Sequence, residues 1–122
     1  MGAVMSVEQT RVIKRLAEVS RMLDAATDEL AVLDEEAVRA KQLYEVEYAR
    51  QFIAADGHPI DVRKSMATLS TAGEKLAYEI AYAKHRACKE RINTLRNQIS
   101  TGQTVSAALR HQFSAEGTGQ FT

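Results

Sequence analysis

The sequence is short of the residues that interrupt or cross-link a chain: it has one Pro, six Gly and one Cys among 122 residues. The single thiol, Cys88, excludes an intramolecular disulfide and favours a reducing compartment, so we expect a cytoplasmic protein. No stretch reaches the ~20 apolar residues that span a bilayer, and no membrane partner is expected. So few helix breakers predict long, uninterrupted helices.

The charges are balanced, with 16 Lys and Arg against 16 Asp and Glu, which argues against binding to nucleic acid or membrane through net charge alone. The balance hides a division, because residues 6–56 carry a net charge of −4 and residues 57–101 a net charge of +4. We therefore expect the acidic stretch of the first half to lie beside the basic stretch of the second. These stretches are Asp24, Asp28, Glu29, Asp34, Glu35 and Glu36, and Lys84, Arg86, Lys89 and Arg91.

A first helix is predicted over residues 6–56. It begins with a capping box, in which Ser6 and Gln9 bond reciprocally to each other's backbone N–H groups. Gly57 can adopt a left-handed cap and Pro59 cannot donate to a continuing helix, so residues 57–60 form a turn. Small or apolar residues recur at spacings of four and three, which is a heptad pattern. They are Val12, Leu16, Val19, Leu23, Ala26, Leu30, Leu33, Ala37, Ala40 and Tyr44, followed by Tyr48, Phe52 and Ala55.

A second helix is predicted over residues 61–101, with Asp61 as its N-cap and a stop near Gly102. Its apolar positions are Val62, Met66, Leu69, Gly73, Leu76, Ile80, Ala83 and Ala87, and then Cys88, Ile92, Leu95 and Ile99. In this register Gly73 faces the Tyr44 ring. A break at Thr71 is the alternative, because weak helix formers surround it. Thr104 would cap a short helix over residues 104–113, and residues 114–122 would form a flexible tail.

The expected fold is therefore all-α: a long, antiparallel, coiled-coil-like helical hairpin with a short third helix at its C-terminal end, in a single domain over residues 1–113. Nineteen of the residues are alanine, which lets helices approach closely but buries little apolar area. An isolated hairpin would be marginally stable. We therefore expect the chain to be a homo-oligomer that forms a larger helical bundle.

One face of the second helix carries Arg86, Lys89 and Arg96, with Tyr82 one turn earlier. Such a face can track a phosphate backbone while the tyrosine stacks on a base, so these residues are candidate contacts to single-stranded DNA. A second candidate group, expected near Arg96 and Arg110, comprises Arg11, Lys14, Arg15 and Arg21. The simpler interpretation is a solvated charged face and a tyrosine packed between helices.

The predicted third helix places Val105, Leu109 and Phe113 on one face, which makes them candidate contacts to a partner protein. His85 and Cys88 have the spacing of two metal ligands, but a structural zinc site needs four, so no metal site is expected. No phosphate-binding loop, zinc-protease motif or nucleophile turn occurs. We expect a protein without a cofactor or catalytic residues, and not an enzyme.

Five segments follow one another in a recognisable order: Tyr44-Glu45-Val46-Glu47-Tyr48-Ala49-Arg50, Gly57, Arg63-Lys64, Leu76-Ala77-Tyr78-Glu79 and Arg91-Ile92-Asn93-Thr94-Leu95-Arg96. In this order and in composition, residues 40–110 resemble small helical proteins of tailed phages and prophages. The resemblance implies an accessory role in DNA recombination or replication. Two alternatives stay open, an adaptor or inhibitor that binds a host factor and a component of the virion or its assembly.

Overall fold

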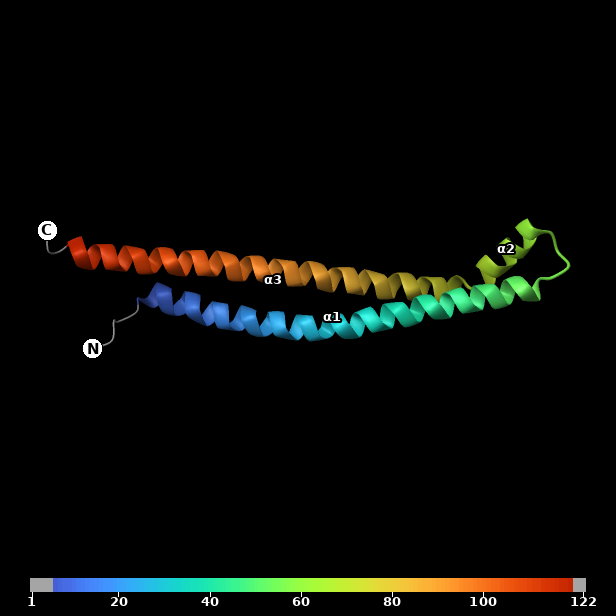
Figure 1. Cartoon of the computed structure of the whole chain (residues 1–122), viewed down its shortest axis with the longest axis horizontal. Helices are drawn as coiled ribbons and strands as arrows, with labels where there is room; N and C mark the ends of the chain where they lie inside the picture. The colour runs from blue at the N-terminus through green and yellow to red at the C-terminus, as the bar shows by residue number, and fades with distance from the viewer. Residues whose placement is uncertain (1–5, 120–122) are drawn as a thin grey trace. The chain divides into compact units, whose positions relative to one another are not determined.

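The computed structural model describes residues 6–119 and is 94% helical, with three helices and no strand in that range. The helices are α1 (Val7–Ala54), α2 (Ile60–Ser70) and α3 (Ala72–Gly119), shown in Figure 1. The two long helices pack against each other, which confirms the all-α prediction. None of the helices described has an apolar stretch long enough to cross a membrane. The backbone divides into two compact units: unit 1 comprises residues 1–27 and 90–122, and unit 2 comprises residues 28–89.

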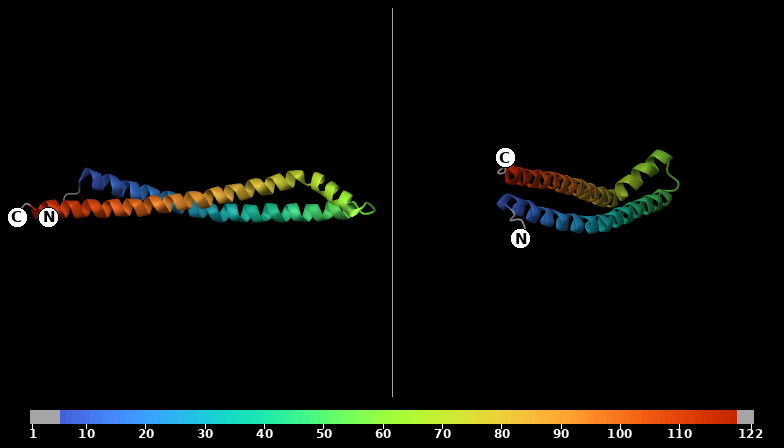
Figure 2. Two further views of the ribbon diagram at one scale, coloured as in Figure 1. Left: turned by 90° about the horizontal axis from the view of Figure 1, so that it is seen from above. Right: turned by 60° about the vertical axis from the view of Figure 1, so that its left-hand side comes forward.

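In unit 1, the start of α1 runs antiparallel to the second half of α3 (Figure 2). The capping box forms as predicted: Ser6 Oγ accepts from the Gln9 N–H at 3.1 Å, and Gln9 Oε1 accepts from the Ser6 N–H at 2.9 Å. Val19, Ile92 and Leu95 are buried between the two helices. The described part of unit 1 is thus a two-helix layer with a thin apolar centre.

In unit 2, the second half of α1 turns back through residues 55–59 into α2 and the start of α3. Gly57 makes the turn possible because its φ of 93° lies in the left-handed region. The Arg63 side chain then fastens α2 to the end of α1. Its Nε and one terminal nitrogen donate to the Phe52 carbonyl at 3.2 and 3.1 Å, and its guanidinium lies 4.1 Å from the centre of the Phe52 ring. The predicted cap at Asp61 is wrong, since α2 begins at Ile60 and has no side-chain cap.

Burial of the predicted apolar positions differs between the two long helices. Every α1 position from Val12 to Tyr44 in the predicted pattern is buried or half-buried, which confirms that register. The positions from Val62 to Ala87 on the second helix are all exposed, so that register is wrong. The chain instead buries a face that we call the inner seam. It comprises Thr71, Glu74, Tyr78, Ala81, His85 and Cys88 in unit 2, and Ile92, Leu95, Ile99, Gly102, Ser106 and Leu109 in unit 1.

Tyrosine rings account for the changed register in unit 2. The Tyr44 and Tyr78 rings are stacked with their centres 5.8 Å apart and 6° between their planes. Tyr48 meets Tyr44 edge-on at 6.2 Å, and Tyr82 meets Tyr78 edge-on at 5.1 Å. Tyr44 therefore packs on Tyr78 rather than in a space left by Gly73, which has nothing within 4 Å of the position of an added Cβ.

The second helix was predicted to be continuous, but it is interrupted at Thr71. The alternative prediction, a break at Thr71, is therefore confirmed. Three hydroxyls near this break bond to their own helix: Ser65 donates to the Asp61 carbonyl, Thr68 to the Lys64 carbonyl and Thr71 to the Ala67 carbonyl. Thr27 and Thr104 make the same kind of bond where the helix continues, so these hydroxyls alone do not account for the break. Backbone bonds from Thr71 to Ala67 and from Lys75 to Thr71 persist, so only one residue leaves the helical conformation.

The predicted stop near Gly102 and the separate helix over residues 104–113 are also wrong, because α3 runs without interruption to Gly119. The Thr104 hydroxyl donates to the Ser100 carbonyl at 3.0 Å instead of capping a new helix. Residues 114–119 of the predicted tail are helical, and residues 120–122 lie outside the described part of the chain. The single domain over residues 1–113 stays a prediction.

Candidate functional site

Unit 1 contains a groove of about 690 Å³ between α1 and α3. Its residues come in two sets, one apolar and one polar. The apolar set is Val12, Leu16 and Val19 from α1 with Gly102 and Val105 from α3; the polar set is Arg11 and Arg15 from α1 with Thr94, Asn97, Gln98 and Thr101 from α3. The groove therefore offers an apolar floor between a cationic α1 edge and a neutral, hydrogen-bonding α3 edge.

At one point of the groove, α3 presents a glycine where α1 presents a long side chain. Gly102 lies against Leu16 so closely that an added Cβ would be 2.6 Å from Leu16 Cδ2 and 3.2 Å from its Cγ. Thr94 and Thr101 are small enough to leave space beside this contact. The close approach at Gly102 holds the Leu16 side chain at the floor, where it is only half-buried.

The cationic edge is available to an incoming group. Arg11 is exposed and has no ion-pair partner among the side chains described, those of residues 6–115. Arg15 pairs with Glu18 at 3.2 Å, but the two side chains are 60% and 54% exposed, and a pair this open contributes little stability. A carboxylate on a ligand can therefore replace Glu18 at low cost. Unit 1 as a whole has seven basic and five acidic residues in its sequence, which favours anionic ligands.

The structure brings together three of the predicted site residues, Arg11, Arg15 and Val105, at this groove. The other predicted cations of unit 1 are exposed but do not line it: Lys14, Arg21 and Arg96. Leu109 and Phe113 line a different hollow of about 260 Å³ together with Ser6, Glu8 and Gln112. The apolar face expected for Val105, Leu109 and Phe113 is thus divided between two surfaces.

Sequence reasoning missed the polar edge contributed by Thr94, Asn97, Gln98 and Thr101. The available signal was the group of polar residues before Gly102, but Gly102 itself was interpreted as a helix stop. In a helix that continues, the same residues form one edge of a groove. Val12 and Leu16 were correctly placed between the helices, but their incomplete burial could not be foreseen.

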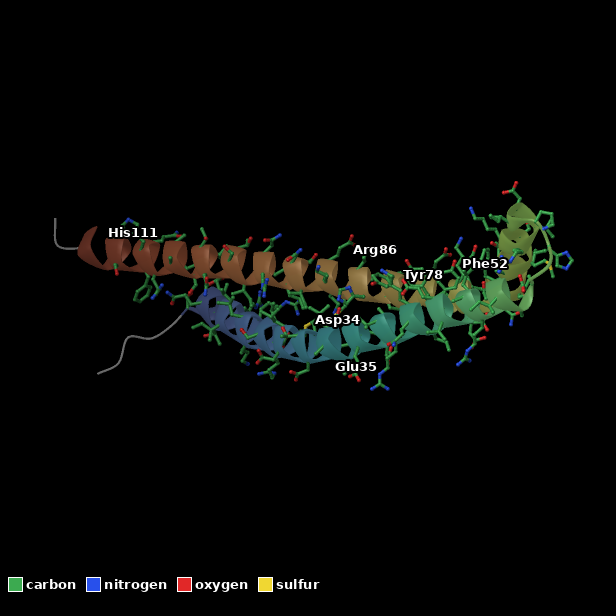
Figure 3. The ribbon with its side chains drawn as sticks, turned by 45° about the vertical axis from the view of Figure 1, so that its right-hand side comes forward. Asp34, Glu35, Phe52, Tyr78, Arg86 and His111 are labelled. Atoms are coloured by element: carbon green, nitrogen blue, oxygen red, sulfur yellow. The ribbon has the colours of Figure 1, made fainter. Side chains whose placement is uncertain are left out.

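The other predicted basic face lies partly in unit 2. Arg86 and Lys89 are exposed there, and Figure 3 shows Arg86 on the side of α3 that faces away from α1. Arg96 belongs to unit 1. Tyr82 is half-buried against Tyr78, so its ring already has a packing partner.

The predicted charge pairing between the helices takes a different form in unit 2. Glu35 bonds with Arg39 of its own helix at 2.6 Å, and Figure 3 shows Glu35 on the far side of α1 from α3. Asp34 does reach α3, where its Oδ1 lies 3.3 Å from His85 Nε2. Cys88 is buried one turn beyond His85. Among the side chains that the structure describes, residues 6–115, no three of His, Cys, Asp or Glu are grouped closely enough to hold a metal ion.

No protein-family model, characterised protein or solved structure that was compared with the chain matches it. The resemblance to phage-encoded proteins therefore stays a prediction.

Proposed function

We propose that the chain is a non-enzymatic, homo-oligomeric helical adaptor that binds a partner protein through the groove of unit 1. The occupant we propose is an amphipathic helix with acidic residues along one edge. The observation that carries this proposal is the apolar floor of Val12, Leu16 and Val105 beside the exposed Arg11 and Arg15. This is the adaptor alternative of the sequence analysis, now attached to a specific surface.

The chemistry of the groove fits a helix in three ways. Apolar side chains at positions i, i+3 or i+4, and i+7 of a partner helix can fill an elongated apolar groove. Arginine forms two parallel hydrogen bonds with a carboxylate, so Arg11 and Arg15 would favour an acidic edge and fix the direction of the helix. Asn97 and Gln98 can bond to polar side chains on the opposite edge. The volume of about 690 Å³ lies within the ~300–1,000 Å³ typical of binding pockets.

The test uses two synthetic amphipathic helices with the same leucine face, one with glutamate along its edges and one with lysine. Fluorescence anisotropy should show that the glutamate peptide binds more tightly, and that Arg11→Glu with Arg15→Glu reduces its affinity by roughly tenfold or more. Arg21→Glu is the matched control, because Arg21 is an exposed cation of α1 in unit 1 that does not line the groove. Equal affinity of the two peptides, or equal losses in all variants, would refute the proposal.

Single-stranded DNA is the second candidate partner, as the resemblance to phage proteins implies. The observation that favours it is that Arg86 and Lys89 are exposed and have no ion-pair partner among the described residues. Phosphate contacts make binding fall steeply with salt. Changing Arg86, Lys89 and Arg96 to Ala should then weaken binding to an oligonucleotide and flatten its salt dependence, whereas Lys75→Ala should not. No binding at low salt would exclude this candidate.

A further inference from the structure

The groove of unit 1 has two unlike ends. Its register is set by the contact between Gly102 and Leu16, since an added Cβ on Gly102 would lie 2.6 Å from Leu16 Cδ2. The start of α1 runs antiparallel to the second half of α3, so the residues before Leu16 lie beside those after Gly102. Arg11 and Val105 therefore mark one end, which we call the arginine end, and Thr94 marks the other, the threonine end.

The apolar floor is more accessible at the arginine end. Val105 is 42% exposed there, and Val12 and Leu16 are only half-buried. Toward the threonine end the floor is formed by Val19, which is 2% exposed and offers little surface to a ligand. An apolar side chain of a partner therefore removes most surface from water at the arginine end.

The two arginines of the α1 edge are not equivalent. The Arg15 guanidinium lies 3.2 Å from the Glu18 carboxylate, whereas Arg11 has no ion pair among the side chains described, those of residues 6–115. A carboxylate of a partner has to replace Glu18 at Arg15, but it meets no such competitor at Arg11. Glu8 is the acidic residue closest to Arg11 in sequence, and it lines the separate hollow of about 260 Å³ instead of the groove. The positive charge that a partner can use is therefore concentrated at the arginine end.

The two ends of an α-helix differ in the same way. The last four carbonyl groups of a helix lack partners within it, and the aligned peptide dipoles place a partial negative charge there. Arg11 carries five N–H donors, so it can bond to a carboxylate and to such carbonyls together. At the threonine end, the oxygens of Thr94, Asn97 and Gln98 can accept hydrogen bonds from the unpaired N–H groups at the start of a helix.

We infer that the partner helix lies in the groove with its C-terminal end against Arg11, parallel to α3 and antiparallel to α1. Its last two turns carry both the apolar side chain that covers Val105 and the carboxylate that binds Arg11. Thr94 and Val105 are 11 positions apart, so the groove holds about three turns, or ~17 Å, of helix. The inference rests on the proposed function, an acidic amphipathic helix as the occupant, and adds its direction and the place of its acidic residues.

Two synthetic peptides of one composition test the place of the acidic residues. Both have the same leucine face and uncharged, capped ends; one has glutamates in its last turn and glutamines in its first, and the other has the reverse. Glutamates in the first turn make the free peptide more helical, but this advantage is the same for every variant of the protein. The quantity to compare is therefore the ratio of the two affinities, measured by fluorescence anisotropy for each variant.

The peptide with glutamates in its last turn should lose its relative affinity, by about threefold or more, when Arg11→Gln replaces the unaltered chain. Lys14→Gln is the matched control, because Lys14 is an exposed cation of α1 that does not line the groove, and it should leave the ratio unchanged. An equal ratio in Arg11→Gln and the unaltered chain, with both peptides bound, would overturn this inference alone. Failure of both peptides to bind would overturn the proposed function and the inference with it.

Disulfide trapping tests the direction by a second route. Thr94→Cys and Thr101→Cys place a thiol at two positions of the α3 edge about 10 Å apart, and the native Cys88 is buried. A peptide with cysteine at its N-terminus should link faster to Thr94→Cys, and one with cysteine at its C-terminus faster to Thr101→Cys. Disulfides need Cα atoms within about 7 Å of each other, so the two positions are distinguishable. The opposite preference, or none, would overturn the parallel orientation to α3.

Discussion

The contact between Gly102 and Leu16 gives the sharpest prediction about unit 1. Substituting alanine for Gly102 has two opposing effects on the free energy of unfolding. The higher helix propensity of alanine adds about 1 kcal/mol of stability. The new Cβ would stand 2.6 Å from Leu16 Cδ2 and 3.2 Å from Cγ, so the whole Leu16 side chain must move, not only its end. Overpacking of this kind costs about 1–3 kcal/mol.

Gly73→Ala is the control without overpacking, because Gly73 lies in the first turn of α3 and has open space where the Cβ would be. We expect Gly73→Ala to be more stable than its parent by up to about 1 kcal/mol. Gly102→Ala should be less stable than Gly73→Ala by about 1–3 kcal/mol, the cost of overpacking alone.

The measurement is urea unfolding followed by circular dichroism, with the two variants and their parent at one protein concentration. If Gly102→Ala stabilises the chain as much as Gly73→Ala does, α1 and α3 do not approach closely at this position. The reasoning about the floor of the groove would then fail as well. The affinity of the Gly102→Ala variant for the peptide is a second measurement, because a displaced Leu16 side chain can move only into the groove or against its own helix, α1.

Two further predictions concern the ends of α1. Arg63→Lys keeps the charge but loses the two hydrogen bonds to the Phe52 carbonyl. Amide hydrogen exchange in α2 should therefore speed up by an amount equivalent to about 1 kcal/mol, with Lys64→Arg as control. Unchanged exchange would mean that Arg63 does not hold α2 against the end of α1. Ser6→Ala removes half of the capping box and should cost about 1 kcal/mol in thermal unfolding, whereas Ser20→Ala, in the exposed interior of the helix, should not destabilise. Equal effects at the two serines would contradict the cap.

The sequence analysis succeeded where a single local pattern determines the structure. The capping box at Ser6, the left-handed Gly57 and the register of α1 each follow from a few neighbouring residues. In α1 the pattern from Val12 to Tyr44 had no competing apolar face of comparable length. The buried positions could therefore be read directly from their spacing.

The predicted positions Cys88, Ile92, Leu95 and Ile99 are buried or half-buried, but before Cys88 the second long helix could not be read in the same way because it carries two apolar faces there. The face that was predicted to be buried, from Val62 to Ala87, has the larger aliphatic residues, such as Met66 and Leu69, and hydrophobicity alone favours it as the core. The chain buries the face with Tyr78 and His85 instead, since Tyr78 stacks on Tyr44 and His85 reaches Asp34. Which face is internal depends on the partner helix, and that information is not local to the second helix.

The same lack of local information explains why the sequence analysis did not predict the groove. Arg11, Arg15 and Val105 were singled out separately, two as cations and one as an apolar residue. Their convergence depends on α3 continuing past Gly102, where a stop was expected. Glycine near the end of an apolar pattern is the usual sign of a helix end. Only the contact with Leu16 reveals that this glycine is instead required for packing.

The two faces of α3 make stability and assembly interdependent. The described core of the single chain is poor in large side chains, because alanine, threonine and cysteine occupy buried positions at Ala26, Ala37, Ala67, Thr71 and Cys88. Each buries far less apolar area than a leucine, at about 25 cal/mol per Å². Several large aliphatic side chains of unit 2 are exposed instead, among them Val38 and Leu43 on α1, Leu69 on α2, and Leu76 and Ile80 on α3. Self-association that covers such side chains would add burial that the single chain cannot supply, and the unfolding temperature should then rise with protein concentration, since association stabilises the folded state by mass action.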